Sequence, residues 1–157
     1  RRDPPRGQKR KGSLSRMAKA DNKTRPTEDS VEAFLDAVGH SGRRKDSFDM
    51  LEMMTRLSGH PPVLWGSIVG FGQYDYTYES GREGEMFLTG FSPRQTAPPS
   101  YIMGGFSAYD DLMSRLGTYK IGKACLYITR LSNVDRSVLE DLIKQSLTCM
   151  RHKYGAE

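Results

Sequence analysis

Residues 63–103 read VLWGSIVGFGQYDYTYESGREGEMFLTGFSPRQTAPPSYIM. Apolar and aromatic residues alternate with polar ones in short groups, and Gly, Ser and Pro separate the groups. A period of two places successive side chains on opposite faces of a sheet. The segment therefore predicts an antiparallel meander of short strands.

Helical periodicity flanks this meander on both sides. Apolar residues recur at helical spacing over about 29–38 and 43–58 before it, and over about 107–116 and 133–152 after it. A short strand over 125–129 separates the last two helices. This order predicts an α+β fold in which helices cover an antiparallel sheet of about five to six strands.

Local signals define the predicted helix ends and inner faces. Asp29 and Glu32 match a capping box for the first helix, and Ser132 with Asp135 predicts the cap of the last one. The second helix is expected to bury a stripe made of Phe48, Leu51, Met54 and Leu57. Three methionines of that helix are interpreted as pliable core residues: Met50, Met53 and Met54.

The positive charge of the chain is concentrated in its first residues. The chain has 157 residues and a net charge of +5, but residues 1–25 hold ten Lys/Arg and two Asp/Glu, which leaves −3 for the rest. We predict a disordered basic tail over 1–26 and one domain over 27–157. Met17 is a plausible start, which would make residues 1–16 an upstream extension. The mildly acidic domain disfavours a nucleic-acid partner.

Cysteine usage and hydropathy predict a cytoplasmic protein without a membrane partner. Cys125 and Cys149 stand far apart and form no Cys-x-x-Cys pair for zinc or thiol exchange. Apolar runs fall short of the roughly 18–20 residues that span a bilayer. The basic N-terminus is followed by no apolar core of a signal peptide.

Two glycine-containing segments resemble phosphate-binding motifs, and we reject both. GTYKIGKA, residues 117–124, matches the start of a P-loop, but Ala124 replaces the Mg²⁺-binding Ser/Thr and a strand is expected to follow. GSIVGFG, residues 66–72, leads into a tyrosine-rich strand, so its glycines are assigned to a bulge, a turn or close backbone approach.

Catalytic constellations are lacking as well. The three histidines lie in separate segments without metal-site spacing, and no nucleophile motif occurs. We therefore predict a protein that is not an enzyme. An enzyme would become the better interpretation if Cys125 were exposed beside His60.

A first candidate site consists of carboxylates. Glu28, Glu32 and Asp36 are spaced four apart on the predicted first helix, beside Asp29. Such oxygen ligands suit a divalent or ferrous ion. The alternative is a solvated acidic face stabilised by the helix dipole.

A second candidate site combines aromatic and cationic residues. Tyr74 and Tyr78 share one strand face, and cations that converge on them and on Trp65 would form a pocket for a small anionic or aromatic metabolite. The alternative is an ordinary hairpin with solvated cations. The predicted ligand-binding residues are Trp65, Tyr74, Tyr78, Arg82, Arg94, Lys120 and Lys123.

Six segments resemble one known family. They are SVEAFL (30–35), WGSIVGFG (65–72), YESGREG (78–84), GFSPR (90–94), YIM (101–103) and GKACLYI (122–128). Over about residues 27–145 the chain resembles the YdhG-like domain family, whose function is unknown.

The resemblance implies a frataxin-like α+β sandwich and, for one branch of that family, an intracellular iron-chaperone role with weakly held iron. On that analogy the iron ligands would be Glu28, Glu32 and Asp36. The leading expectation is thus a non-catalytic iron-binding domain. The alternatives are the metabolite pocket and, third, an unrecognised enzyme.

Overall fold

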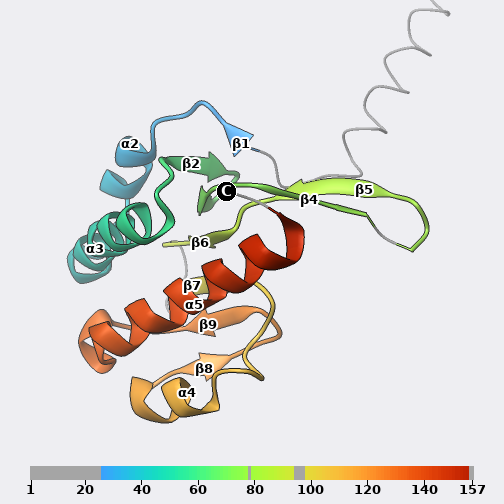
Figure 1. The fold of residues 1–157 in the computed structure, drawn as a ribbon. Coiled ribbons are helices and arrows are strands. Elements are labelled where there is room, and N and C mark those ends of the chain that lie inside the picture. The colour runs from blue at the N-terminus through green and yellow to red at the C-terminus, as the bar shows by residue number, and fades with distance from the viewer. Residues whose placement is uncertain (1–25, 78, 94–97, 156–157) are drawn as a thin grey trace, which may run out of the picture.

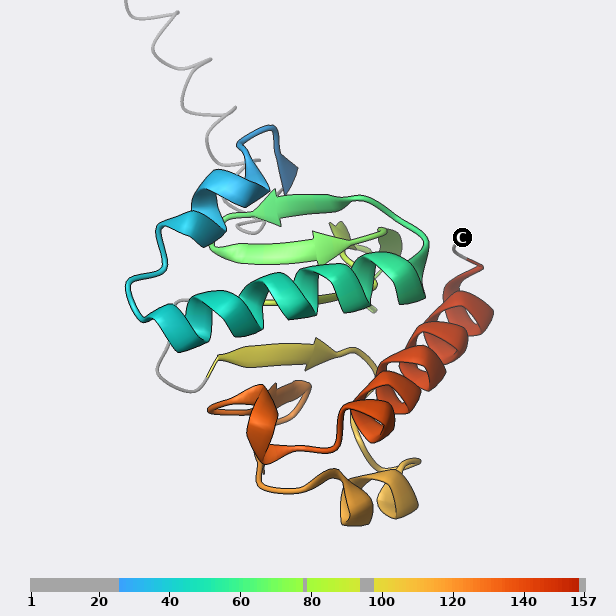
Figure 2. The same cartoon turned by 90° about the vertical axis from the view of Figure 1, so that its left-hand side faces the viewer.

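A computed structural model describes residues 26–77, 79–93 and 98–155, and residues 1–25 of the predicted tail over 1–26 lie outside these residues. The predicted α+β fold is confirmed, with helices packed against one face of an antiparallel sheet (Figures 1 and 2). The helices are α2 (Val31–Asp36), α3 (Ser41–Ser58), α4 (Asp110–Leu116), the 3₁₀ turn η1 (Leu131–Asn133) and α5 (Arg136–Tyr154). The strands are β1 (Pro26–Thr27), β2 (Pro62–Trp65), β3 (Ile68–Phe71), β4 (Tyr74–Thr77), β5 (Glu83–Met86), β6 (Thr89–Phe91), β7 (Pro99–Ile102), β8 (Lys120–Ile121) and β9 (Cys125–Tyr127).

The main sheet has more strands than the pattern predicts. Within the described residues it contains seven strands in the order β1-β2-β3-β6-β7-β9-β8, and every neighbouring pair is antiparallel. The two edge strands β1 and β8 contain two residues each. Because two residues are too few to display a period of two, the sequence pattern does not predict them.

The predicted meander leaves the main sheet in its middle. Val69 of β3 pairs directly with Phe91 of β6, so the chain between these strands forms a ribbon of its own, β4 paired with β5. The hydrogen bond from Leu88 N to Phe71 O closes the base of this ribbon at 3.0 Å. The ribbon and its turn, residues 74–86, extend away from the sheet (Figure 1) and are called the arm below.

The caps of α2 and α5 differ from the predicted ones. The Ser30 hydroxyl accepts a hydrogen bond from Ala33 N at 3.1 Å, so α2 starts after Ser30 and the predicted capping box is wrong. At α5 the predicted Ser132 cap is wrong because η1 occupies that position. The Asp135 carboxylate instead accepts from Ser137 N and Val138 N, and the hydrogen bond from the Ser137 side chain lowers the pKa of Asp135.

The helices bury their inner faces against the sheet. In α3 the predicted methionine core is confirmed, but the other members of the expected stripe are only half-buried. In α5 the predicted helical spacing of apolar residues is confirmed, and the residues that it places on the inner face are buried: Val138, Leu139, Leu142, Ile143, Leu147 and Met150.

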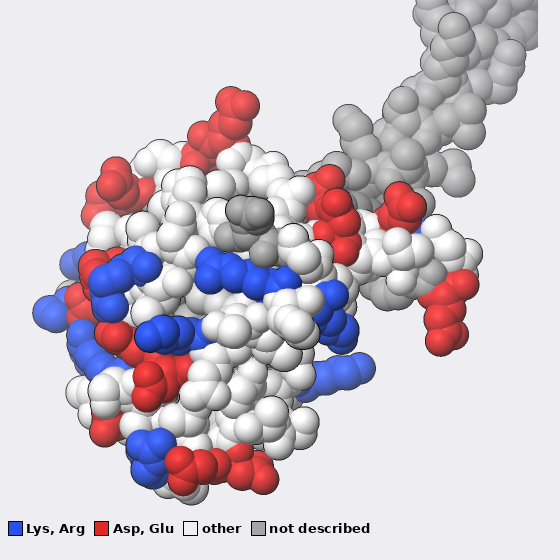
Figure 3. Space-filling view, in the orientation of Figure 1, with Lys and Arg blue, Asp and Glu red and all other residues white. Residues whose placement is uncertain are grey.

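Polar contacts join α3 to α5 at the surface. Arg56 Nη2 lies 2.8 Å from Glu140 Oε2, and Arg136 Nη2 lies 3.0 Å from Asp49 Oδ2. The hydrogen bonds from Arg56 lower the pKa of Glu140. Basic and acidic side chains therefore interleave over these helices (Figure 3).

Candidate functional site

The structure does not bring the predicted aromatic and cationic residues together. Tyr78 and Arg94 lie outside the described residues. Trp65 lies on β2, whereas Lys120 lies on β8 and Lys123 follows it, five strand positions across the sheet. Five spacings correspond to about 24 Å. Arg82 lies in the turn of the arm, away from both. Trp65, Arg82 and the two lysines therefore do not share one pocket in this structure.

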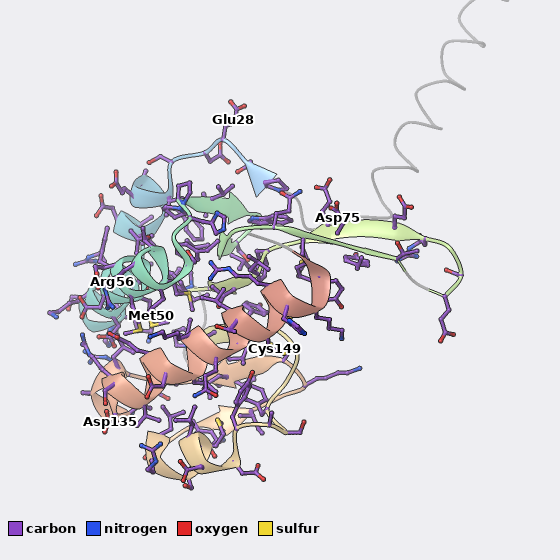
Figure 4. All side chains as sticks on the ribbon, in the orientation of Figure 1. Glu28, Met50, Arg56, Asp75, Asp135 and Cys149 are labelled. Carbon is purple, nitrogen blue, oxygen red and sulfur yellow. The ribbon has the colours of Figure 1, made fainter. Side chains whose placement is uncertain are left out.

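The predicted carboxylate set is not assembled either. Since α2 begins at Val31, Glu28 precedes the helix and does not share a helix face with Glu32. The Glu28 side chain points away from the body of the domain (Figure 4). Glu32 and Asp36 are exposed on α2. Within the described residues, no group of three or more His, Cys, Asp or Glu could hold a metal ion. The three carboxylates thus do not fit a shared iron site in this conformation.

Residues 117–124, which we rejected as a P-loop, connect α4 to β9. Gly117 ends α4 and bridges to Val134, and the following residues form β8 and the turn into β9. The condition for the enzyme interpretation is not met, because Cys125 on β9 lies four strand positions from β2, which directly follows the segment of His60.

A different group of polar residues gathers at the start of α3. Three arginines lie there: Arg43 and Arg44 in the first turn, and Arg130, which arrives from the segment before η1. The first turn of α3 contains no acidic residue. A Cβ at Gly42 would lie 2.6 Å from Arg130 Nη1, so the glycine leaves room for that guanidinium. Because the helix N-terminus is itself positive, this region attracts anions.

Two of these three arginines have partners. Arg44 Nη1 donates to Val38 O at 2.7 Å. Arg130 Nε donates to Asp46 Oδ2 at 2.7 Å, and the same carboxylate oxygen accepts from Leu131 N at 3.0 Å. Burial alone would raise the pKa of Asp46, but the hydrogen bonds from Arg130 and Leu131 outweigh it and the pKa is lowered. The Asp46 carboxylate is therefore held in place by its ion pair with Arg130.

Arg43 differs from its neighbours. Its Nε is buried and has no hydrogen-bond partner among the described residues, and no ion pair of Arg43 is found within that part of the chain. Its backbone N–H donates to His40 Nδ1 at 3.0 Å, which positions the residue as part of the helix cap. A buried guanidinium nitrogen without a partner is costly, so a ligand acceptor at this position would be stabilising.

Arg43 lies between two hollows. On one side is a groove of about 330 Å³ between the end of α2 and the residues after β6; we call it the Arg43 groove. On the other side is a small inner cavity of about 30 Å³ under α3. The walls of the groove are mostly apolar and comprise Phe34, Ala37, Val38, Gly39, Arg43 and Pro93. The inner cavity adds hydroxyl groups from Ser47, Ser100 and Thr129.

The sequence pattern alone does not predict the Arg43 groove. Arg43, Arg44 and Lys45 follow one another in the sequence, and such a run is typical of a solvated helix face. The relevant signal is the missing acidic residue at the start of α3, where negative side chains are favoured. Which of the arginines lacks a partner depends on Arg130, 84 positions from Asp46, and so on the tertiary structure.

Comparisons with known proteins identify no relative for this chain. No protein-family model, curated protein or solved structure matches it. In the part of the chain that the structure describes, no helix is long and apolar enough to cross a membrane. The function must therefore be inferred from the geometry itself, and the YdhG-like resemblance stays a prediction.

Proposed function

We propose that the protein is a non-catalytic binding module for a small organic anion with an apolar body. The observation that carries the proposal is Arg43, whose buried Nε lacks a partner in the described structure although the neighbouring arginines are bound. A carboxylate or phosphate would accept from this guanidinium in the fork geometry that arginine favours.

The walls of the Arg43 groove support the second half of the proposal. Phe34, Val38 and Pro93 offer apolar contacts to the body of the ligand beside the charged head. A volume of about 330 Å³ lies at the lower end of the range typical of ligand pockets. This volume suits a small ligand rather than a large cofactor.

Iron binding, the leading expectation from the resemblance, receives no such support. Its three predicted ligands are exposed and do not converge, as described above. It stays a prediction that a metal titration can test independently of the groove.

The proposal is tested by calorimetry on the full chain. Hexanoate and phenylacetate serve as probes with an apolar body, and inorganic phosphate serves as the probe without one. We expect the two carboxylates to bind more tightly than phosphate. Arg43→Gln should weaken carboxylate binding by roughly 10-fold or more, since a hydrogen bond to a charged group contributes about 1.5–3 kcal/mol and 1.4 kcal/mol is tenfold.

A matched control removes an arginine elsewhere. Arg115 lies on α4, and its ion pair with Asp111 is exposed, so Arg115→Gln removes the same charge without touching the groove. Affinity should be unchanged in this variant, and circular dichroism should show that both variants fold. Equal loss in both variants, or no loss in Arg43→Gln, contradicts the proposal.

A further inference from the structure

The Asp46 carboxylate has two neighbouring arginines, Arg43 and Arg130. Asp46 follows Arg43 by three positions on α3, a spacing that places the two side chains side by side on the helix, with about 5–6 Å between Cβ atoms. Both residues line the inner cavity under α3. An ion pair between them would be the ordinary result of this spacing. In the described part of the chain, however, Asp46 pairs with Arg130, and no ion pair of Arg43 is found.

Several contacts hold Asp46 on Arg130. Arg130 Nε donates to Asp46 Oδ2 at 2.7 Å, and Leu131 N donates to the same oxygen at 3.0 Å. The Arg130 guanidinium lies against Gly42, where any side chain would displace it. The Asp46 side chain is only 15% exposed. A carboxylate with so little access to water is destabilised without a charged partner, so it would turn to Arg43 if Arg130 were removed.

This choice of partner decides whether Arg43 can bind a ligand. If Arg43 were paired with Asp46, its donors would be occupied and its charge neutralised before an anion arrived. With Asp46 on Arg130, the buried Arg43 Nε has no hydrogen-bond partner among the described residues. Neither Asp46 nor Arg130 lines the Arg43 groove, so both act on the groove only through Arg43.

We propose that Arg130 is a positioning residue that keeps the Arg43 groove open to anions by holding Asp46 away from Arg43. The pair Arg130–Asp46 is the open state of the site, and the pair Arg43–Asp46 is its closed, autoinhibited state. This inference rests on the function proposed above, because Arg43 must be the group that binds the anion. It adds a means of regulation, since loss of the Arg130–Asp46 pair switches binding off.

The first test is calorimetry with hexanoate on the full chain. Arg130→Gln should weaken hexanoate binding by roughly 5-fold or more, because 5-fold is the upper end for an exposed ion pair and the Asp46 side chain is largely buried. The double variant Arg130→Gln/Asp46→Asn also removes the competing carboxylate, so its affinity should return to within about twofold of the wild type. If Arg130 acted only on folding, the second substitution would not restore binding.

A matched control breaks another ion pair of α3. Arg136 Nη2 lies 3.0 Å from Asp49 Oδ2, so Arg136→Gln removes an arginine from a carboxylate of the same helix without releasing Asp46. Hexanoate affinity should be unchanged in this variant. Circular dichroism should show that all variants are folded at the temperature of the titration.

A second measurement observes Arg43 directly and needs no ligand. The Nε–H signal of Arg43 in a nuclear magnetic resonance spectrum is assigned by its loss in Arg43→Gln. In Arg130→Gln this signal should move downfield, because the N–H gains a carboxylate acceptor. In the double variant it should return to its position in the wild type.

The outcomes distinguish this inference from the proposed function. Absence of hexanoate binding by the wild type contradicts the proposed function, and the Arg43 signal then tests the exchange of partners by itself. If hexanoate binding depends on Arg43 but is unchanged in Arg130→Gln, the proposed function stands and the inference is wrong. Failure of the double variant to restore affinity, or an Arg43 signal that does not move in Arg130→Gln, also overturns the inference.

Discussion

The two faces of the main sheet are packed in different ways. The face toward the helices is filled with aliphatic side chains and methionines, such as Val69, Leu126 and Met54, in one continuous core. The opposite face carries a separate group of rings formed by Trp65, Phe87 and Tyr101. Trp65 is 2% exposed and Phe87 is fully buried, yet neither belongs to the helix-side core.

The ring face depends on glycines in the strands beneath it. Trp65 and Phe87 are in edge contact at 5.6 Å between centroids. A Cβ at Gly70 would lie 2.7 Å from Trp65 Cδ1, and one at Gly90 would lie 2.7 Å from Val69 O. Large rings can therefore lie against the sheet only where the strands lack side chains. The comparison shows that one face of the sheet is stabilised by packed helices and the other by aromatic rings that lie over Gly70 and Gly90. We call these two glycines the glycine floor.

The largest expected effect concerns the helix-covered face. Leu139 of α5 is fully buried in the core, and Leu139→Ala removes its contacts and leaves a cavity. The free energy of unfolding, measured by urea denaturation, should fall by about 2–5 kcal/mol. A loss below about 1 kcal/mol, typical of a surface substitution, would show that α5 contributes little to this core.

The next effect tests the glycine floor of the ring face. Gly90→Ala places a methyl group against the backbone oxygen of Val69, which cannot move away easily. We expect urea denaturation to show a loss of about 1–3 kcal/mol, the usual cost of overpacking. Gly39→Ala is the control because a Cβ there meets no atom within 4 Å. If both substitutions have equal effects, the floor is not required.

A smaller effect is expected in the pH dependence of stability, through Asp46 of α3 on the helix-covered face. Hydrogen bonds from Arg130 and Leu131 lower the pKa of Asp46 in the folded state. The unfolded state therefore takes up the proton first as the pH falls, so this stabilisation is present above the ordinary Asp pKa and is lost below it. The free energy of unfolding should be measured by urea denaturation between pH 7 and pH 3. At neutral pH it should be lower in Asp46→Asn than in the wild type, and this loss should be smaller than the loss caused by Gly90→Ala. The difference should shrink in acid, and a constant difference would exclude the linkage.

The smallest expected effect concerns iron binding by the three carboxylates on and just before α2. Because Glu28, Glu32 and Asp36 do not converge, replacing them with Gln, Gln and Asn should leave Fe²⁺ affinity unchanged in an anaerobic calorimetric titration. A clear drop in affinity in this triple variant would restore the iron hypothesis. The outcome is independent of Arg43, so it separates the iron hypothesis from the organic anion proposed for the Arg43 groove.

The fold was largely predictable from periodicity, and the candidate sites were not. The spacing of apolar residues in α5 and the alternation in the strands depend on local geometry, so both predictions are confirmed. The predicted turn or close-approach role of the glycines is confirmed as well, with Gly66 and Gly72 at φ 68° and 71° and Gly70 beneath Trp65. The predicted pocket depended on cations converging on Trp65 and the tyrosines, and the position of Lys120 on β8, five strand positions from β2, could not be read from any local pattern.

By itself, the sequence determined the α+β class, the helices and most strands, because each depends on residues within a few positions of one another. Only the tertiary structure decided that β3 pairs with β6 and that the arm leaves the sheet. It also decided that Arg130 pairs with Asp46, that Arg43 Nε has no hydrogen-bond partner in the described chain, and that the Tyr154 ring contacts the Tyr74 ring. These contacts join residues about 80 positions apart, and their choice depends on the packing of the whole domain rather than on any local pattern.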